Sequence, residues 1–475
     1  IKVSEEIKNF FNLNINNFNF YFEVVSSENQ KNFLEKIKSF VKKNVLTSIL
    51  YCLYLEYKKK KQKILPTLNK SKKVVISYYY PGGQTFDSGF YTKYYEDASF
   101  LLSQTYNWLF LFVGNISMLK QENEKLKEKV NTFGFLDAFF SLNDFKKVVF
   151  KFLEVKKKID TIDTKNLFLF EQIDYFSLIK NDWLTSKSIL LIELMVLEKK
   201  IFNFFKANPQ IDEIIYLMEF QPWESMLNKI AKIKNVTTKG AIHSVVRQNM
   251  MNYYHSKLIN SYLYKPSYVG VNSNFSKLLL LNDGFNSDQV FEIEAQRFNY
   301  LLKKDDESYP KIKRSKKTIL IITSIIPKET KELLEYFALS NIKFEKVFIK
   351  EHPLLKVRSI IKSSIKNFPN FEIVDCTVSE AFKLSDIVYT ANGSSVLLES
   401  VVRNKQTVSL ISLSTLPIPA VNKASNLHFV YDTISLCKIL NRLINTKDAE
   451  TNIVEKKDYL YLDKELHLWR KFIEK

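Results

Sequence analysis

Cysteine is scarce in this chain of 475 residues, with Cys52, Cys376 and Cys437 standing far apart. A disulfide framework and a zinc cluster both require closely spaced cysteines, so neither is expected. No group of His, Asp or Glu has metal-ligand spacing, and no Asp-x-Asp follows a predicted strand. We therefore expect a reducing compartment and a metal-independent protein.

Long apolar runs are missing as well. A membrane helix needs roughly 18–20 apolar residues, and the best candidates, Trp108–Val113 and Ile189–Leu197, are much shorter. The first residues are charged and lack the apolar core of a signal peptide. We expect a cytoplasmic protein whose closest approach to a membrane is peripheral attachment to the inner leaflet.

Glycine and proline are few, at 9 and 11, whereas 70 Lys and Arg outnumber 51 Asp and Glu to give a net charge of +19. A basic surface favours anionic partners. The densest cluster, Lys58 to Lys73, is interpreted either as a solvated helix end or as a membrane-surface patch. No nucleic-acid module stands beside it, so nucleic acid is not an expected partner.

Two blocks of alternating strands and helices, 74–300 and 317–475, are separated by a polar stretch at 301–316 that we interpret as a linker. A mixed, basic extension covers 1–73, and a helical insertion covers about 115–207. Strands that alternate with helices predict an α/β fold with two doubly wound, Rossmann-like domains and a cleft between them.

The expected strands end at the motifs that carry chemistry, as ligand sites of parallel sheets do. In the first block the strands are Val74–Tyr80, Trp108–Val113, Glu213–Met218, Thr237–Ile242 and Ser267–Asn272. In the second they are Thr318–Thr323, Lys346–Ile349, Glu372–Val374, Ile387–Tyr389 and Thr407–Leu410. Helices are expected from about Tyr91 to Leu102, at Met118–Val130, Trp183–Phe205 and Phe275–Leu281, and at Leu460–Phe472, which could pack back across the domain boundary.

A small-residue turn, Asn392-Gly393-Ser394-Ser395, joins one strand to a helix that begins at about Val396. The N–H groups and hydroxyls of such a turn can hold a phosphate, and N-capping uses the same groups. Glu399 follows one turn later on the same helix face as Ser395. Its carboxylate could accept from a ribose hydroxyl, or it could be a surface or capping group.

A second strand end carries Lys350-Glu351-His352-Pro353, and we expect it to neighbour the Gly-Ser-Ser turn. The imidazole of His352 can donate to a phosphate oxygen, Lys350 adds charge, and Pro353 fixes the turn. The alternative is a helix-capping turn without a ligand. Together, the two strand ends predict a nucleotide-sugar site.

In the first block, Glu219 and Glu224 flank a rigid Gln221-Pro-Trp at a strand end. Sugar transfer to a hydroxyl benefits from a base, and either carboxylate could serve while the other holds the acceptor or stabilises positive charge. Glu219 could instead cap the next helix. His243 and Arg247, after the next strand, suit a phosphate or a sugar carboxylate. A packed loop histidine is the alternative.

Several segments together resemble a family of bacterial surface carbohydrate biosynthesis proteins, whose members look like GT-B glycosyltransferases. The segments are Gly89-Phe-Tyr-Thr-Lys-Tyr-Tyr95, Trp183-Leu-Thr-Ser, Tyr216-Leu-Met-Glu-Phe-Gln-Pro-Trp-Glu224, Gly240-Ala-Ile-His-Ser244 with Arg247, and Glu292-Ile-Glu-Ala-Gln-Arg-Phe298. The His-Pro and Ser-Ser pair is similar to motifs of sialyltransferases and Kdo transferases, which hold CMP with it. It also resembles the glycerophosphotransferases of teichoic acid synthesis, but Thr390-Ala391-Asn392 stands where an acidic-aromatic turn is expected.

The resemblance implies transfer of a CMP-linked nonulosonic or Kdo-type sugar to a surface glycan or lipid-linked acceptor of capsule or lipopolysaccharide, with no cofactor besides the nucleotide-sugar donor. The implied donor-binding residues are Lys350, His352, Pro353, Asn392, Gly393, Ser394, Ser395 and Glu399. The catalytic candidates are Glu219, Glu224 and His243, and the substrate-binding candidates are Gln221 and Arg247. The alternatives are a CDP-polyol phosphotransferase and a non-catalytic GT-B module that binds glycan.

Overall fold

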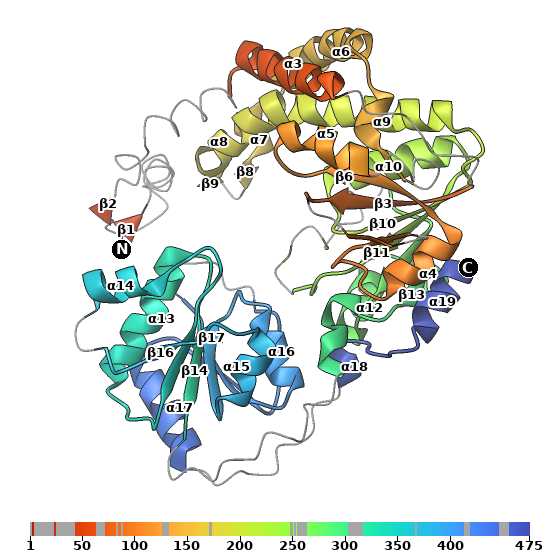
Figure 1. Cartoon of the computed structure of the whole chain (residues 1–475). Coiled ribbons are helices and arrows are strands. Elements are labelled where there is room, and N and C mark those ends of the chain that lie inside the picture. Colours follow the sequence, from red (N-terminus) through yellow and green to blue (C-terminus); the bar gives the residue numbers. More distant parts are fainter. Residues whose placement is uncertain are drawn as a thin grey trace.

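The computed structural model describes two parallel sheets with the helices around them (Figure 1). The described residues are 2–3, 23–24, 43–62, 72–81, 84–86, 89–125, 133–170, 173–247, 250, 253, 264–302, 317–365, 368–412, 419–445 and 456–475. Most of the expected linker, 303–316, and most of the basic extension lie outside these residues.

The first sheet has seven parallel strands in the order β13-β12-β11-β10-β3-β6-β7. Their bounds are β3 (Lys73–Tyr79), β6 (Asn107–Phe112), β7 (Phe133–Phe135), β10 (Glu213–Leu217), β11 (Thr237–Ala241), β12 (Tyr268–Val271) and β13 (Val290–Glu292). The chain builds outward from β3 to β7 and then restarts on the other side with β10. The strand order therefore reverses between β3 and β10, where doubly wound sheets place their ligands.

The second sheet has six parallel strands in the order β16-β15-β14-β17-β18-β19. They are β14 (Ile319–Ile322), β15 (Val347–Lys350), β16 (Glu372–Ile373), β17 (Ile387–Ala391), β18 (Gln406–Leu410) and β19 (Leu427–Val430). The order reverses between β14 and β17. The predicted fold class, two doubly wound domains of GT-B type, is confirmed by these two sheets.

Helices cover both faces of the second sheet. They are α13 (Pro327–Ser340), α14 (Val357–Ser364), α15 (Val378–Lys383), α16 (Val396–Val402) and α17 (Thr433–Asn445). On one face, Leu333 and Phe337 of α13 and Leu440 of α17 share a core with alternate strand residues. On the other face, Phe382 of α15 packs among the remaining strand residues. The strands are buried on both faces, which explains their continuous Ile, Leu and Val runs.

A helical layer covers one side of the first sheet, at the top of Figure 1. It contains α3 (Val45–Lys61), α5 (Ile116–Lys125), α6 (Leu142–Asp160), α7 (Thr164–Leu167), α8 (Phe176–Thr185), the π-helical turn η5 (Ser186–Leu190) and α9 (Leu191–Ala207). The 3-10 turn η4 (Leu136–Phe139) follows β7, and a hairpin, β8 (Leu169–Phe170) and β9 (Ile173–Asp174), interrupts the layer. The expected helical stretch is thus present but not uninterrupted.

One expected helix is displaced. Instead of starting near Tyr91, the chain forms a hairpin of β4 (Gln84–Phe86) and β5 (Gly89–Tyr91), and α4 begins at Ala98 and ends at Thr105. The reason is the aromatic side chain of Phe90, which is buried against Tyr79 and Phe110 and favours extended backbone.

The C-terminal segment returns to the first sheet, as the sequence suggested. After α18 (Lys456–Tyr459), the helix α19 (His467–Glu474) lies beside β13 and α4 (Figure 1). Its Trp469 and Phe472 join the core of the first sheet. The Glu294 carboxylate accepts from the N–H groups of Leu468 and Trp469, both at 2.8 Å. The helix is therefore fixed to the first sheet by both apolar and polar contacts.

Candidate functional site

The turn after β10 is strained. Phe220 has a φ of 55°, a left-handed conformation that a bulky residue rarely adopts. Its ring is held by edge contacts with Tyr253 at 5.1 Å and Phe285 at 6.1 Å. Helix α10 (Pro222–Ile233) starts directly afterwards, with Pro222 in its first turn. Packing of the ring thus holds the left-handed backbone of Phe220, next to Glu219. Backbone strain of this kind is frequent at functional sites.

Glu224 is buried, and its carboxylate accepts hydrogen bonds from the backbone of this turn. Its two carboxylate oxygens lie 3.1 and 3.2 Å from the Glu219 backbone nitrogen, and it also accepts from the N–H groups of Gln221 and Phe220. Burial nevertheless raises the pKa of Glu224 to about 8. The capping function that the sequence suggested for Glu219 therefore belongs to Glu224, and at neutral pH this carboxyl group is mostly protonated.

Glu219 has a different environment. Its Oε1 lies 3.3 Å from Nε2 of His243, and its side chain is 35% exposed against 7% for His243. Burial, and after it the charge of Arg297, lowers the pKa of His243 to about 4. The imidazole is therefore neutral at pH 7, with its Nε2 beside the Glu219 carboxylate. The buried Nδ1 has no hydrogen-bond partner among the described residues.

Tyr94 contacts both His243 and Tyr80, and so joins the ends of β11 and β3. Its ring meets the His243 ring edge-on at 5.1 Å, and its hydroxyl donates to Tyr80 at 3.0 Å. Tyr80 directly follows β3, whereas His243 follows β11. The Glu219–His243 pair thus lies where the ends of β3, β10 and β11 converge.

Two arginines add positive charge. Arg247 is half-buried, and its Nε lacks a partner within the described part of the chain. Burial and the charge of Arg297 lower the pKa of Arg247, while Glu329, in the first turn of α13, acts in the opposite direction. Arg247 of the first domain therefore lies within electrostatic reach of the second.

Arg297 is the residue that sequence reasoning missed. It is exposed on the 3-10 turn η7 (Gln296–Leu302), which follows β13. Its charge acts on Tyr94, His243 and Arg247 in the first domain and on Glu399 in the second. The available signal was its position in one of the segments that carried the family resemblance, but no motif there pointed to an anion site.

Glu399 does not have the open position expected of a ribose contact. It is buried, and the hydroxyl of Tyr300 donates to its carboxylate across the domain boundary. Burial raises the pKa of Glu399, while Tyr300, Arg403 and Arg297 counteract that shift. Around it, Phe298 and Leu301 of η7 share an apolar cluster with Leu397 and Val401 of α16. Glu399 thus lies at the junction between the domains.

The two donor motifs do not follow neighbouring strands, which corrects an expectation. Strand β14 lies between β15 and β17, so His352 and Gly393 flank the end of β14, about 10 Å apart at the usual strand spacing. Thr323, just after β14, links the first motif to this point, because its Oγ1 accepts from the His352 N–H at 3.1 Å and donates to the Lys350 carbonyl at 3.5 Å. The motifs face one another across a threonine.

His352 is a turn residue that still has a donor to offer. Its Nδ1 accepts from the N–H of Leu354 at 3.2 Å, so in the neutral ring the proton lies on Nε2. Pro353 is exposed, and Lys350 is half-buried as the last residue of β15. A capping turn and a phosphate donor, considered above as alternatives, are therefore compatible in this geometry.

The Asn392–Ser395 turn is open only in part. Asn392 is buried, and its backbone and side-chain N–H groups both donate to the Leu410 carbonyl, at 3.1 and 3.2 Å. Ser394 Oγ accepts from Val396 N–H at 3.3 Å, and the Ser395 side chain makes no cap. A Cβ added to Gly393 would meet nothing within 4 Å. Gly393 thus borders open space, whereas Asn392 bonds to the neighbouring strand.

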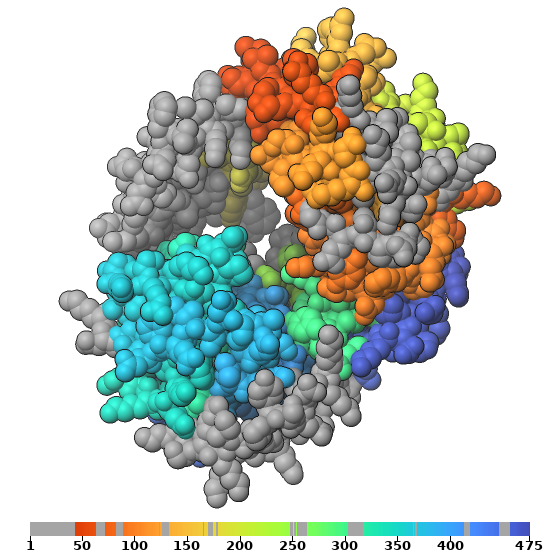
Figure 2. Space-filling model, viewed as in Figure 1, coloured from red at the N-terminus to blue at the C-terminus, as the bar shows by residue number. Residues whose placement is uncertain are grey.

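Gln221 lines a pocket of about 290 Å³ beside α10, together with Glu224, Asn228 and Tyr264. Neither Arg247 nor Arg297 is among the residues that line this pocket. A second pocket, of about 180 Å³, lies between the domains, lined by Val245 and Phe275 on one side and Leu398 and Val421 on the other. Figure 2 shows the hollow between the lobes. The described residues contain no group of three or more metal-binding side chains.

Comparison with known proteins finds only distant structural likeness. Neither a protein-family model nor a curated protein matches the sequence. Among solved structures, MurG of Acinetobacter baumannii has 10% identity and a TM-score of 0.44, with 85% of this chain and 98% of that one covered. S. aureus MnaA, solved with UDP, has 12% identity and a TM-score of 0.44, with 82% of this chain and 93% of that one covered. A UDP-N-acetylglucosamine 2-epimerase from Rickettsia bellii has 11% identity and a TM-score of 0.44, with 86% of this chain and 95% of that one covered.

Likeness at this level carries no argument about this protein. The resemblance of the His-Pro and Ser-Ser pair to CMP-dependent transferases therefore stays a prediction. Within the described residues, no helix is long and apolar enough to cross a membrane.

Proposed function

We propose that this protein is a glycosyltransferase that moves a sugar from a nucleotide-activated donor to a hydroxyl of a glycan or lipid-linked acceptor. The observation that carries the proposal is the position of Arg297. This exposed cation acts on the Glu219–His243 pair in the first domain and on the Glu399 junction in the second. In this proposal Glu219 is the base and Arg297 is the anion-binding group.

The donor belongs to the second domain in this proposal. Gly393 offers open space for close backbone approach to a phosphate, and His352 offers its Nε2–H from the other side of β14. Arg297 and Arg247 would neutralise the charge that develops on the leaving phosphate, since guanidinium groups bind phosphate through paired hydrogen bonds. No metal is required for this charge balance.

The chemistry follows from the two carboxyl groups. Glu219 accepts the proton of the acceptor hydroxyl while the acceptor oxygen forms a bond to the anomeric carbon. The bond from that carbon to the phosphate oxygen breaks, and the nucleotide leaves with the electron pair. His243 positions Glu219 by contact through Nε2, and the protonated Glu224 avoids a second negative charge beside the base.

Arg297 and Arg247 can serve two kinds of donor. A CMP-linked nonulosonic or Kdo-type sugar carries a phosphate and a sugar carboxylate, one for each arginine, whereas a diphosphate donor with a neutral sugar would use both arginines on phosphate. The resemblance of the His-Pro and Ser-Ser pair to CMP-dependent transferases favours the first, so the CMP-linked acid is the donor that we propose.

The test is nucleotide binding by calorimetry and thermal shift, with CMP, CDP, UMP, UDP and GDP. We expect CMP to stabilise the wild type in proportion to its concentration. Arg297→Ala should weaken binding roughly 10- to 100-fold, the range for a lost charge-assisted hydrogen bond. Arg470→Ala, an exposed arginine on α19, is the matched control and should bind like the wild type.

Gly393→Ala provides a second arm. The added methyl group meets no protein atom, so stability should not change, while nucleotide affinity should fall. Preference for UDP or GDP would keep the transferase and overturn the CMP-linked donor. Preference for CDP with turnover of CDP-glycerol would favour the polyol phosphotransferase. Glycan binding without any nucleotide binding would leave a non-catalytic module.

A further inference from the structure

Helix α3 presents an apolar stripe to solvent. Residues 46, 50, 53, 54 and 57 recur at intervals of three and four, which places them on one helix face. They are 38 to 64% exposed, and the stripe consists of Leu46, Leu50, Leu53, Tyr54 and Tyr57. Contiguous exposed surface of this kind marks an interaction site rather than a random scatter of apolar residues.

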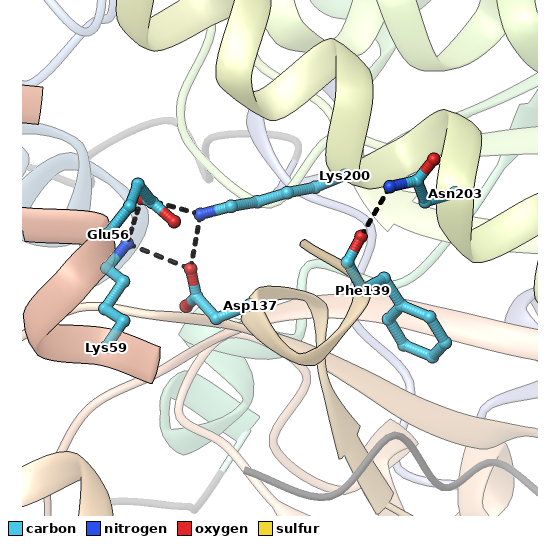
Figure 3. A network of polar contacts seen from close by, with 6 residues as sticks. All are labelled: Glu56, Lys59, Asp137, Phe139, Lys200 and Asn203. Atoms are coloured by element: carbon cyan, nitrogen blue, oxygen red, sulfur yellow. Dashed lines mark hydrogen bonds and ion pairs between the residues drawn. The ribbon is translucent and has the colours of Figure 1, made fainter. Parts of the chain in front are cut away.

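The opposite face shows that the helix is fixed in this orientation. Ser48, Cys52 and Glu56 are buried, and Cys52 belongs to an apolar cluster with Phe145 of α6 and Ile192 of α9. Asn44 caps the first turn through Thr47 N–H at 3.2 Å. Figure 3 shows Glu56 and Lys59 joined to Asp137 and Lys200 beneath the helix. The apolar stripe therefore faces outward because the other face is committed to the core.

Charge on the outward face has one sign. Lys58, Lys60 and Lys61 are exposed in the last turn, and the Nζ atoms of Lys58 and Lys61 lie 4.6 and 4.7 Å from the Tyr54 and Tyr57 ring centres. The sole acidic residue of α3 is Glu56, which is buried. The stripe is thus apolar and aromatic at one end and basic at the other.

The apolar surface continues beside the helix. A shallow depression of about 640 Å³ lies between the start of α3, α6 and η5, and its lining includes Leu46, Ile49 and Leu153. Lys156 and Lys187 also line it, and both pair with Asp160. Phe150 is exposed on α6. In Figure 2, α3 lies on the outer surface next to α6.

We propose that α3 docks this protein on an anionic lipid bilayer. The helix would lie in the plane of the surface, with the leucines at the boundary between headgroups and acyl chains, the tyrosines at headgroup level, and the three lysines on anionic headgroups. A bilayer is favoured over an acidic protein because the stripe combines leucine, tyrosine and lysine along one helix, with the apolar residues and the lysines at different ends. The proposal does not depend on the transferase function.

Co-sedimentation of the full chain with vesicles tests the proposal. We expect binding to vesicles of phosphatidylcholine with phosphatidylglycerol, weak or no binding to phosphatidylcholine alone, and a loss of binding at high salt. Each lysine near an anionic surface contributes about 1 kcal/mol, so Lys58→Gln, Lys60→Gln and Lys61→Gln together should weaken binding roughly 100-fold.

A second variant separates the apolar contribution. Leu50→Ser, Tyr54→Ser and Tyr57→Ser together should reduce vesicle binding at low and at high salt. Circular dichroism checks that the fold is kept. The matched control, Ile434→Ser with Lys438→Gln, changes an exposed apolar residue and an exposed lysine on α17. It should bind like the wild type. The proposal is overturned if the vesicles do not bind, if the control loses binding equally, or if the α3 variants abolish self-association instead.

Discussion

Two glutamates five residues apart have opposite chemical character because one is buried and the other is not. The carboxylate oxygens of Glu224 accept from N–H groups of a strained turn, and burial raises its pKa to about 8. Glu219 is partly exposed and lies beside His243. Sequence could not separate them, since both follow the same strand. The distinction comes from packing around the turn, which no local pattern encodes.

The first prediction concerns the base. Glu219→Gln removes the proton acceptor and keeps the shape, so transfer should slow by roughly 10²- to 10⁴-fold. Donor binding should be unchanged, and the free energy of unfolding should move by less than about 0.5 kcal/mol because the side chain is partly exposed. Steady-state kinetics and calorimetry measure the two effects. A larger loss of activity in Glu224→Gln than in Glu219→Gln would reverse the assignment.

The second prediction concerns pH. The pKa of Glu224 rises from 4.5 to about 8 on folding, so between these values the folded state holds a proton that the unfolded state has released. The stabilising contribution is complete below the unfolded pKa and is lost as the pH rises through the folded one. The stability of the wild type relative to Glu224→Gln should fall as the pH is raised from about 5 to about 8. Urea titrations at each pH check this, and an opposite slope would refute it.

At the level of elements, buried strands with a continuous apolar run were predictable even where they are short. The apolar runs of β3, β10, β14 and β17 are continuous because parallel strands are covered on both faces. The strands β7, β13 and β19 were missed: β7 and β13 have three residues each, and the four residues of β19 include His428. The position of β14 between the two donor motifs also escaped prediction, because chain order does not specify order within a sheet.

The third prediction concerns the ion network that fixes α3. Lys200 is buried, with Nζ 2.9 Å from Glu56 and 2.6 Å from Asp137 (Figure 3). Although burial acts in the opposite direction, Lys200 and Lys59 together hold the pKa of Asp137 well below its usual range. Lys200→Met leaves two buried carboxylates with Lys59 alone. Removing one partner of such a network costs about 3–5 kcal/mol.

A matched control is available on α6. Lys158 forms an exposed pair with Glu154 at 2.9 Å, and Lys158→Met should leave the unfolding free energy nearly unchanged. Urea unfolding of both variants gives the comparison. Equal effects of the two substitutions would mean that the network contributes no more than a surface ion pair.

For the whole molecule, the core of the first domain is completed by the closing helix α19, which belongs to the last residues described. The sequence suggested that a closing helix at Leu460–Phe472 could pack back across the boundary, but the helix begins only at His467 and the partners that hold it were not predictable. Glu294 accepts from its first turn, and the buried Lys239 donates from Nζ to the Ile473 carbonyl at 2.9 Å. These contacts join residues more than 170 positions apart.

The fourth prediction follows from this attachment. In hydrogen exchange, peptides of α19 should exchange together with β3 and β11 of the first sheet, and not with β17 and β18 of the second. Phe472→Ala, which empties a fully buried site, should cost about 3–5 kcal/mol and raise exchange in the first sheet. Ile434→Ser on α17 serves as the control. Raised exchange confined to the second sheet in Phe472→Ala would contradict the attachment.

The returning helix also bears on synthesis. On the ribosome, β3 to β13 emerge first, and the whole second domain is translated before residues 467–474 appear. During that interval the apolar surface that Trp469 and Phe472 later cover is exposed, and Lys239 lacks its carbonyl partner. Nascent domains with exposed apolar surface are those that aggregate or recruit chaperones. The domain that is made first is therefore the one that matures last.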